Sequence, residues 1–344
     1  MNHSALSADK SPATKELRRL SILDGWRALS ITLVMAGHLL PLGINEAVAG
    51  MGMVIFFTLS GFLITRFLIE DGNLRRFAIR RILRILPLSW AGALIAMGIA
   101  GGTIDQLVGN LFFYANLPPF HLLPAAGHFW SLSVEVQFYA AAALLVALGG
   151  QRALLLLPLL GLAVTALRVA DGQYMNIVTW YRVDEILAGA SLALIYEGKF
   201  GEGAKRLLAW FNPFILLPIL LLSAHDLGGP LNYVRPYLSA LMVGASLFSA
   251  PQWLQALSRS RPVVYVANIS FALYVFHGLL ASSWLGSGDT LIKYAKRPLL
   301  IAATFASAHL STFHYERYWI SLGHRLTRRE PGGKGAHATA RTLK

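Results

Sequence analysis

The chain contains no cysteine, which excludes disulfides, thiolate chemistry and Cys-ligated metal sites. Charged residues are also scarce, at 14% of 344 residues, where a soluble domain has about 25%. Apolar residues take their place, at 55% of the chain with a mean hydropathy of +0.54. Apolar runs of about 20 residues recur along the sequence, and each is long enough to cross a membrane as a helix. The composition therefore predicts a polytopic membrane protein.

Two polar segments flank the apolar part of the chain. Residues 1–20 lack the apolar core and small-residue cleavage site of a signal peptide, so we expect the first span to insert as a signal anchor. Residues 326–344 are basic and rich in Gly, Ala and Thr, and we expect them to be disordered. Residues 21–325 between them are predicted to form one transmembrane domain, in which we find no internal repeat.

The apolar runs predict an all-α, polytopic helical bundle of about ten spans, at 24–42, 48–69, 82–101, 127–148, 152–170, 177–196, 207–224, 230–250, 262–284 and 297–317. Basic residues gather in alternate loops, and this pattern places both termini in the cytoplasm. One loop disagrees, because Lys293, Lys296 and Arg297 fall outside on this topology. We therefore interpret the net charge of +13 as a topology signal and not as a sign of nucleic-acid binding. The expected partner of the chain is the lipid bilayer.

Ionisable side chains inside the predicted spans are costly and usually face a cavity, a partner or a substrate path. Arg27 and His38 are 11 positions apart in the first span, which puts them on one helix face about 16 Å apart. Asp24 lies close to the same face. With straight helices, Glu135 in the fourth span and His277 in the ninth fall at the depth of His38. Three ionisable groups at one depth in mid-membrane indicate a buried reaction site.

His38 is the candidate general base, because an imidazole takes up a proton near neutral pH. The alternative is a structural histidine that is hydrogen-bonded to a neighbouring carbonyl. Glu135 is the candidate partner that orients the imidazole and is expected to pair with a buried His or Arg, while Asp24 or a backbone carbonyl are alternatives. The longest outside loop, 103–126, is a candidate lid or substrate-binding segment, with a plain connector as the alternative.

Arginines near the cytoplasmic ends of the second and third spans are candidates for binding phosphate. Arg66 ends the second span, and a cluster follows it, made of Arg75, Arg76, Arg80, Arg81 and Arg84. Arg80 and Arg84 are one helical turn apart, so both can hold one phosphate group. The alternative for the cluster is topology and lipid contact. For Ser60 and Gly61 in the second span, the alternative to a functional role is close helix packing.

These residues belong to an ordered set of motifs that makes the sequence resemble acyltransferase family 3, a family of membrane O-acyltransferases, over about residues 20–325. The set comprises Leu23-Asp24-Gly25-Trp26-Arg27 with His38, Phe56 to Leu63, Phe77 to Pro87, Phe129 to Glu135, Arg182-Val183-Asp184, Ile269 to Tyr274 with His277, and Tyr315-Glu316-Arg317. An arginine, ten intervening residues and a histidine are the family signature, matched by Arg27 and His38. Trp26 and Tyr318 depart from the usual motifs, and neither change removes a reactive group.

The resemblance implies ten helices, an acyl-CoA donor, usually acetyl-CoA, and an acceptor hydroxyl on a surface glycan, a lipid-linked sugar or a secreted small molecule. It implies a multi-pass protein of the bacterial inner (plasma) membrane, and it adds Trp130, Ser133, Arg182, Asp184, His277 and Glu316 to the candidate site. The hydrolase-like domain that some members append does not occur in this sequence, so we expect the membrane core alone to perform the transfer.

The predicted activity is therefore O-acetyl transfer from cytoplasmic acetyl-CoA to an exported carbohydrate, with no metal required. The catalytic set is His38, Arg27, Glu135 and Asp24, with His38 as general base or transient acyl carrier. The donor-binding set is Ser60, Arg66, Arg80, Arg81 and Arg84. The alternative is a transporter or flippase that uses the same His, Arg and Glu as a binding site or proton relay; a non-catalytic scaffold would not need aligned ionisable groups.

Overall fold

The computed structural model describes residues 20–328, which are entirely helical apart from loops and turns. The expectations for 1–19 and 329–344 lie outside the described residues. The elements in chain order are α1 (Ser21–Leu39), α2 (Asn45–Glu70), α3 (Leu74–Ala100), α4 (Ile104–Leu111), η1 (Pro124–Phe129), α5 (Trp130–Gly149), η2 (Gln151–Leu156), α6 (Leu157–Ala170), η3 (Thr179–Tyr181), α7 (Asp184–Tyr196), α8 (Gly201–Ala209), α9 (Pro213–Ser223), η4 (Asp226–Gly228), α10 (Leu231–Ser249), α11 (Gln252–Ser258), α12 (Arg261–Ala281), η5 (Trp284–Gly286), α13 (Thr290–Ala295), α14 (Arg297–Leu310), η6 (Ser311–Glu316) and α15 (Arg317–Leu326).

Each of the ten predicted spans contains helix, and the all-helical prediction is confirmed for the described residues. Within residues 20–328, five helices are long and apolar enough to cross a membrane: α2, α3, η1–α5, η2–α6 and α12. A sixth is possible if α8 and α9, which meet at a bend of 82°, form one broken span. The structure thus supports a multi-pass membrane protein, whereas the count of ten spans stays a prediction.

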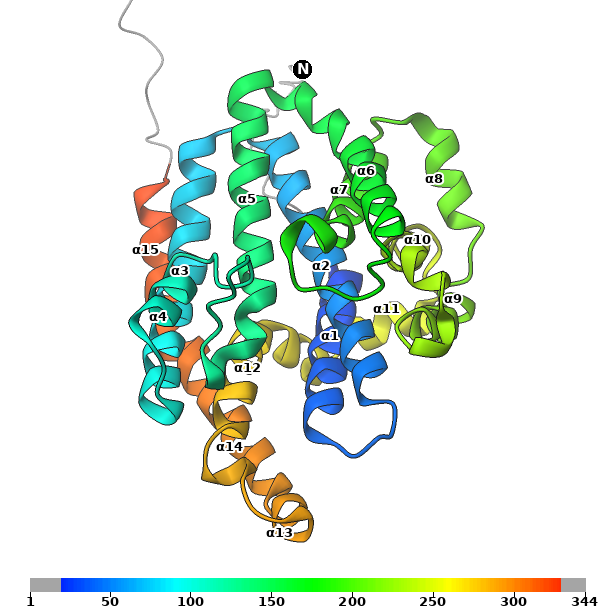
Figure 1. Cartoon of the computed structure of the whole chain (residues 1–344). Coiled ribbons are helices and arrows are strands. Elements are labelled where there is room, and N and C mark those ends of the chain that lie inside the picture. The colour runs from blue at the N-terminus through cyan, green and yellow to red at the C-terminus, as the bar shows by residue number, and fades with distance from the viewer. Residues whose placement is uncertain (1–19, 329–344) are drawn as a thin grey trace, which may run out of the picture.

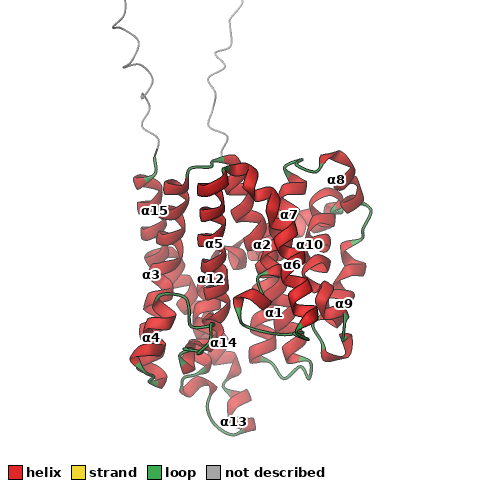
Figure 2. Ribbon diagram, turned by 45° about the horizontal axis from the view of Figure 1, so that its top comes forward, coloured by secondary structure: helices red, strands yellow, loops and turns green. Residues whose placement is uncertain are grey.

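The helices define two ends of the bundle, which we call proximal, where α1 begins, and distal, where α1 ends. α12 runs parallel to α1, since Gly25 lies against Ser258 and His38 contacts His277. The chain returns through α14, η6 and α15, whose last residues reach the first turns of α3, where Arg80 binds Thr327. Both ends of the described chain therefore lie at the proximal end, while α13 projects at the distal end (Figures 1 and 2).

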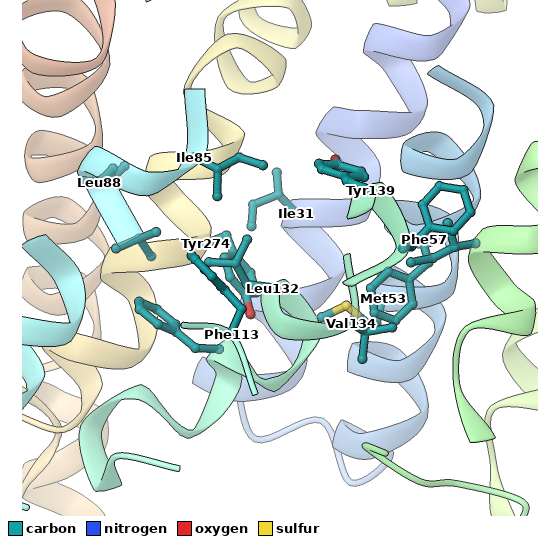
Figure 3. Close-up of a cluster of buried hydrophobic side chains, with 14 of the residues drawn as sticks. Ile31, Met53, Phe57, Ile85, Leu88, Phe113, Leu132, Val134, Tyr139 and Tyr274 are labelled. Carbon is teal, nitrogen blue, oxygen red and sulfur yellow. The ribbon is translucent and has the colours of Figure 1, made fainter. Parts of the chain in front are cut away.

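α2 forms the centre of the bundle, and glycines let its neighbours approach closely. A Cβ atom at Gly61 would collide with the carbonyl of Ile186 in α7, and one at Gly189 would collide with the carbonyl of Thr58. On the other side, Ser30 of α1 donates to the carbonyl of Gly52 at 2.8 Å. Side chains from α1, α2, α3, α5 and α12 then complete a continuous apolar core (Figure 3).

The basic loop that disagrees with the predicted topology lies at the distal end, and two of its three charges, Lys296 and Arg297, have local contacts. Lys296 donates to the carbonyls of Trp284 and Ser287 at 2.9 and 3.2 Å and also lies over the Trp284 ring. Arg297 is buried against the Tyr294 ring. A solvated charge that must stay on one side of a membrane sets topology, so charges occupied by local contacts are weaker topology signals.

Candidate active site

Three histidines from three elements meet near the distal end of the bundle. His38 lies in the last turn of α1, His277 in the last two turns of α12, and His128 in η1 just before α5. Nδ1 of His38 is 3.1 Å from Nε2 of His277, and the two rings are nearly parallel, at 13°, with their centroids 5.2 Å apart. The His128 ring stands edge-on to His277 at 4.8 Å. The predicted convergence of His38 and His277 is thus confirmed.

The first helix is shorter at its distal end than predicted, because α1 ends at Leu39 and not at residue 42. His38 therefore lies at the distal end of its helix and is exposed, whereas His277 is only 1% exposed. The pair combines one imidazole that a molecule approaching from the distal end can reach with one that is enclosed by protein. A molecule can therefore meet His38 without entering the middle of the bundle.

Backbone and hydroxyl contacts hold the His128 ring in place against α12. Tyr274 donates its hydroxyl to the carbonyl of His128 and accepts from Ser131 at 2.7 Å, which ties η1 and α5 to α12. Nε2 of His128 lies 3.3 Å from the carbonyl of Val275. A Cβ atom at Gly278 would collide with the His128 ring, so this ring fills a notch that only glycine leaves open.

Glu135 does not join the histidines, contrary to prediction. Its carboxylate accepts hydrogen bonds from the hydroxyls of Ser60 and Tyr139. Its place on α5 is seven residues beyond His128, a helical rise of about 10 Å toward the proximal end. The prediction of one shared depth assumed equivalent span boundaries, whereas His277 meets His128 near the start of the continuous η1–α5 helix, well before Glu135. No carboxylate is hydrogen-bonded or ion-paired to the three imidazoles within residues 20–328.

Glu135 instead lines a separate cavity of about 170 Å³, which we call the arginine chamber. Its polar lining consists of Arg27, Ser60, Arg81, Arg84, Glu135, Tyr139 and Ser270. Arg27 pairs with Asp24 at 3.3 Å, and Arg84 lies 3.5 Å from Glu316 while remaining one-third exposed. Three guanidinium groups around one cavity, with fewer carboxylates, favour an anionic ligand.

The chamber lies on the proximal side of the histidines. Ser270 in the chamber is seven residues before His277 on α12, about 10 Å, and Arg27 is eleven residues before His38 on α1, about 16 Å. A ring pair stands between them, since Phe56 lines the chamber and stacks on Tyr274, which borders the histidines. A molecule with a charged head in the chamber can reach His38 only with an extended arm.

Comparison with known proteins identifies the family of the chain. Residues 20–315 match the family model described as an acyltransferase domain. The chain belongs to acyltransferase family 3.

Similar curated proteins include the peptidoglycan O-acetyltransferase OatA of Listeria monocytogenes, at 26% identity over 84% of this chain and 54% of that protein. Another is the "Putative peptidoglycan O-acetyltransferase YrhL" of Bacillus subtilis, at 27% identity over 77% of this chain and 49% of that protein. The acyltransferase spans about half the length of these relatives. No solved structure matched it.

The arginines predicted to bind the donor do not form one cradle in this acyltransferase. Arg81 and Arg84 line the chamber, whereas Arg80 donates to Thr327 in the turn after α15 at 3.0 Å. Arg66 is 3.0 Å from both Glu70 and Glu197 and links the proximal ends of α2 and α7. The proposed joint grip of Arg80 and Arg84 on one phosphate is therefore not preformed.

The remaining predicted residues of the acyltransferase lie around these two sites. Arg182 stands over the Trp130 ring at 5.2 Å and pairs with Glu185 at 3.3 Å. Asp184 pairs with Arg168 at 2.6 Å. Both belong to a buried ion-pair cluster that joins α6, α7 and α10. Ser133 donates to the carbonyl of Phe129 at 3.4 Å, and Glu316 accepts from Thr312 at 2.8 Å beside Arg84.

Sequence reasoning missed several residues that this geometry brings forward. His128 was the main one, although it precedes Glu135 by seven residues, which is two helical turns on one face. The ion-pair cluster also contains Arg235, completely buried and 2.8 Å from Glu185. Arg168 and Arg235 are charges in apolar helices, and that signal alone marks them as groups with buried partners. Within the described residues, no group of His, Asp and Glu is arranged to hold a metal ion.

Proposed function

We propose that this protein transfers an acetyl group from acetyl-CoA, bound at the proximal end, to a hydroxyl of an exported glycan at the distal end. One observation carries the proposal. The bundle contains an arginine-lined chamber and an exposed imidazole, and the distance between them can be bridged by an extended arm of a ligand bound in the chamber. The names of the relatives support a cell-wall glycan as the acceptor class. Basic loops lie at the proximal end of the bundle, and they support placing this end in the cytoplasm if the protein spans a bacterial inner membrane.

In this function the arginine chamber binds phosphate groups of the donor. Arg27, Arg81 and Arg84 provide delocalised charges whose N–H groups match phosphate oxygens. The thioester must then extend about 16 Å toward His38, the helical rise between Arg27 and His38. The Phe56–Tyr274 ring pair lies on this path, so binding of the donor requires these rings to separate.

His38 performs the proton transfer at the distal end. In direct transfer, it takes the proton from the acceptor hydroxyl, whose oxygen forms a bond to the acetyl carbon. The carbon–sulfur bond breaks, and the thiolate of CoA receives the proton from the imidazolium. In the two-step alternative, the imidazole itself carries the acetyl group before the hydroxyl takes it. Both routes require an unprotonated ring nitrogen on His38 that the reactants can reach.

A transporter or flippase is the competing function. The bend between α8 and α9 is the kind of discontinuity that transporters use, but it lies away from the residues that line the chamber. Family membership and the exposed imidazole favour acyl transfer.

The proposal is tested by comparing exported glycans, by mass spectrometry, from cells that carry the wild-type gene, no gene, or the His38→Ala variant. We expect the acetyl mass increment only with the wild type. Identical glycans in all three strains, with the protein present in the membrane, would contradict the proposal.

A further inference from the structure

The two nitrogens of the His38 ring differ chemically, and the contacts around His277 decide which one carries the proton. We propose that His277, and not a carboxylate, is the positioning residue that fixes the tautomer of His38, so that the two imidazoles act as one unit. The inference rests on the proposed function only in treating His38 as the reacting group; the assignment of hydrogens follows from the geometry.

The backbone carbonyl of Tyr274 determines the tautomer of His277. Nδ1 of His277 is 2.7 Å from this carbonyl oxygen, and a carbonyl can only accept a hydrogen bond. Nδ1 therefore carries the hydrogen, and Nε2 of neutral His277 presents its lone pair.

The same reasoning then fixes His38. Its Nδ1 lies 3.1 Å from Nε2 of His277, so Nδ1 of His38 carries a hydrogen and donates it to that lone pair. Nε2 of His38 is left unprotonated, and it has no hydrogen-bond partner within residues 20–328. The exposed imidazole thus offers a basic nitrogen to the acceptor hydroxyl, as the proposed reaction requires.

The surroundings of His277 fix the position of its ring and so preserve this chain of hydrogen bonds. His277 is 1% exposed, so water does not compete for its nitrogens. The His128 ring packs edge-on against it and is itself held on the neighbouring turn of α12, through the carbonyl of Val275 and the notch at Gly278. His277 is therefore fixed both by its own carbonyl contact and by a second imidazole.

An imidazole partner suits an apolar setting better than a carboxylate does. A carboxylate would place a permanent negative charge among buried side chains, which is costly unless it is paired. His277 is neutral before the reaction. When His38 takes the hydroxyl proton on Nε2, the hydrogen on its Nδ1 can move to His277, which shares the positive charge and keeps its own bond to Tyr274. The hydrogen returns when His38 protonates the thiolate, so protons balance over the cycle.

The test combines a spectroscopic and a kinetic measurement on the full-length protein in lipid vesicles. Histidine is labelled with ¹⁵N, and the His38 signals are identified by comparison with His38→Gln. In His277→Phe a ring remains but both nitrogens are lost, whereas His277→Gln keeps an amide oxygen that can accept from His38. The matched control is His309→Phe, which removes an imidazole of α14 that is hydrogen-bonded to Tyr265 and lies away from the three histidines.

We expect wild-type His38 to hold its hydrogen on Nδ1, and His277→Phe to give a mixture of tautomers. Its kcat should fall about 100-fold, within the usual contribution of a positioned base, at an unchanged KM for acetyl-CoA. His277→Gln should recover part of the loss, and His309→Phe should match the wild type.

Wild-type His38 with its hydrogen on Nε2 would overturn the inference, whether or not the protein transfers acetyl groups. Full kcat in folded His277→Phe would overturn it as well. A wild-type protein that shows the expected tautomer but transfers no acetyl group would support the hydrogen-bond assignment and refute the proposed function instead.

Discussion

At the scale of single residues, neighbouring positions in one motif serve different purposes. Ser60 donates its hydroxyl to Glu135 in the arginine chamber, while Gly61 faces the other way and lets the α7 backbone approach. Side chains one position apart on a helix diverge by about 100°, so a short motif can contribute to a site and to helix packing at once. The packing role considered for this motif is thus confirmed for Gly61, and Ser60 belongs to the chamber.

The different surroundings of Arg84 and Arg80 predict different effects on donor binding. Arg84→Ala should raise the KM for acetyl-CoA about 10- to 100-fold, because a hydrogen bond to a charged group contributes about 1.5–3 kcal/mol. Arg80→Ala should change it less than about threefold, since Arg80 bonds Thr327 outside the chamber. Arg84→Lys keeps the charge beside Glu316, so its KM for acetyl-CoA should lie between those of the wild type and Arg84→Ala. Equal effects of the two alanine variants, measured on folded protein, would contradict this distinction.

Glu135 provides a second test at this scale. Because its partners are Ser60 and Tyr139 and not a histidine, Glu135→Gln should not move the acid limb of the pH–rate profile, which reports protonation of the base. The KM for acetyl-CoA should change instead, since the chamber loses its carboxylate. A shifted acid limb in purified Glu135→Gln protein would show that the carboxylate acts on His38 after all.

At the scale of elements, α12 connects the two sites. Ser270 lines the chamber, and Tyr274, His277 and Gly278 hold the histidines. Residues 270, 274 and 277 follow one helix face at spacings of four and three. Because α1 runs parallel to α12, its residues Arg27 and His38 lie at the levels of the chamber and of the histidines, respectively. Two parallel helices thereby set the distance between the arginine chamber and the histidines.

Gly278→Ala tests how tightly α12 holds His128. The added methyl group would collide with the His128 ring, and overpacking of this kind costs about 1–3 kcal/mol. We expect lower thermal stability and a lower kcat. The control is Gly98→Ala near the end of α3, where an added Cβ meets nothing within 4 Å, and where the better helix propensity of alanine should leave stability equal or higher. Similar melting temperatures for both variants would show that the notch is not required.

The sequence predicted the elements better than their contacts. Apolar runs and charged loops located helices in all ten segments, because the cost of burying backbone and charge in a membrane acts locally. The partners of Glu135 and His277 depend on helix ends and rotations that no single segment determines. α1 ends three residues earlier than predicted, and the histidines meet at the level of His128, about 10 Å of helical rise from Glu135.

At the scale of the whole molecule, the bundle places the arginine chamber and the three histidines at different levels. Cations at the proximal end surround the arginine chamber, and the exposed His38 lies at the distal end. An enzyme of this design does not need to carry the whole donor across the membrane, because only the thioester arm has to reach His38. In the proposed reaction, the acetyl group crosses while the nucleotide stays on the side where it bound.

The most direct test of this account uses purified protein in sealed vesicles, with a glycan acceptor enclosed and acetyl-CoA added outside. Because both orientations form on reconstitution, the correctly inserted fraction is determined by protease protection of the proximal loops. With wild-type protein we predict acetylated acceptor inside the vesicles, in proportion to that fraction, and with His38→Ala a rate lower by about 10²–10⁴-fold. Near-normal transfer by folded His38→Ala, or transfer only when acetyl-CoA and acceptor share one compartment, would contradict the account.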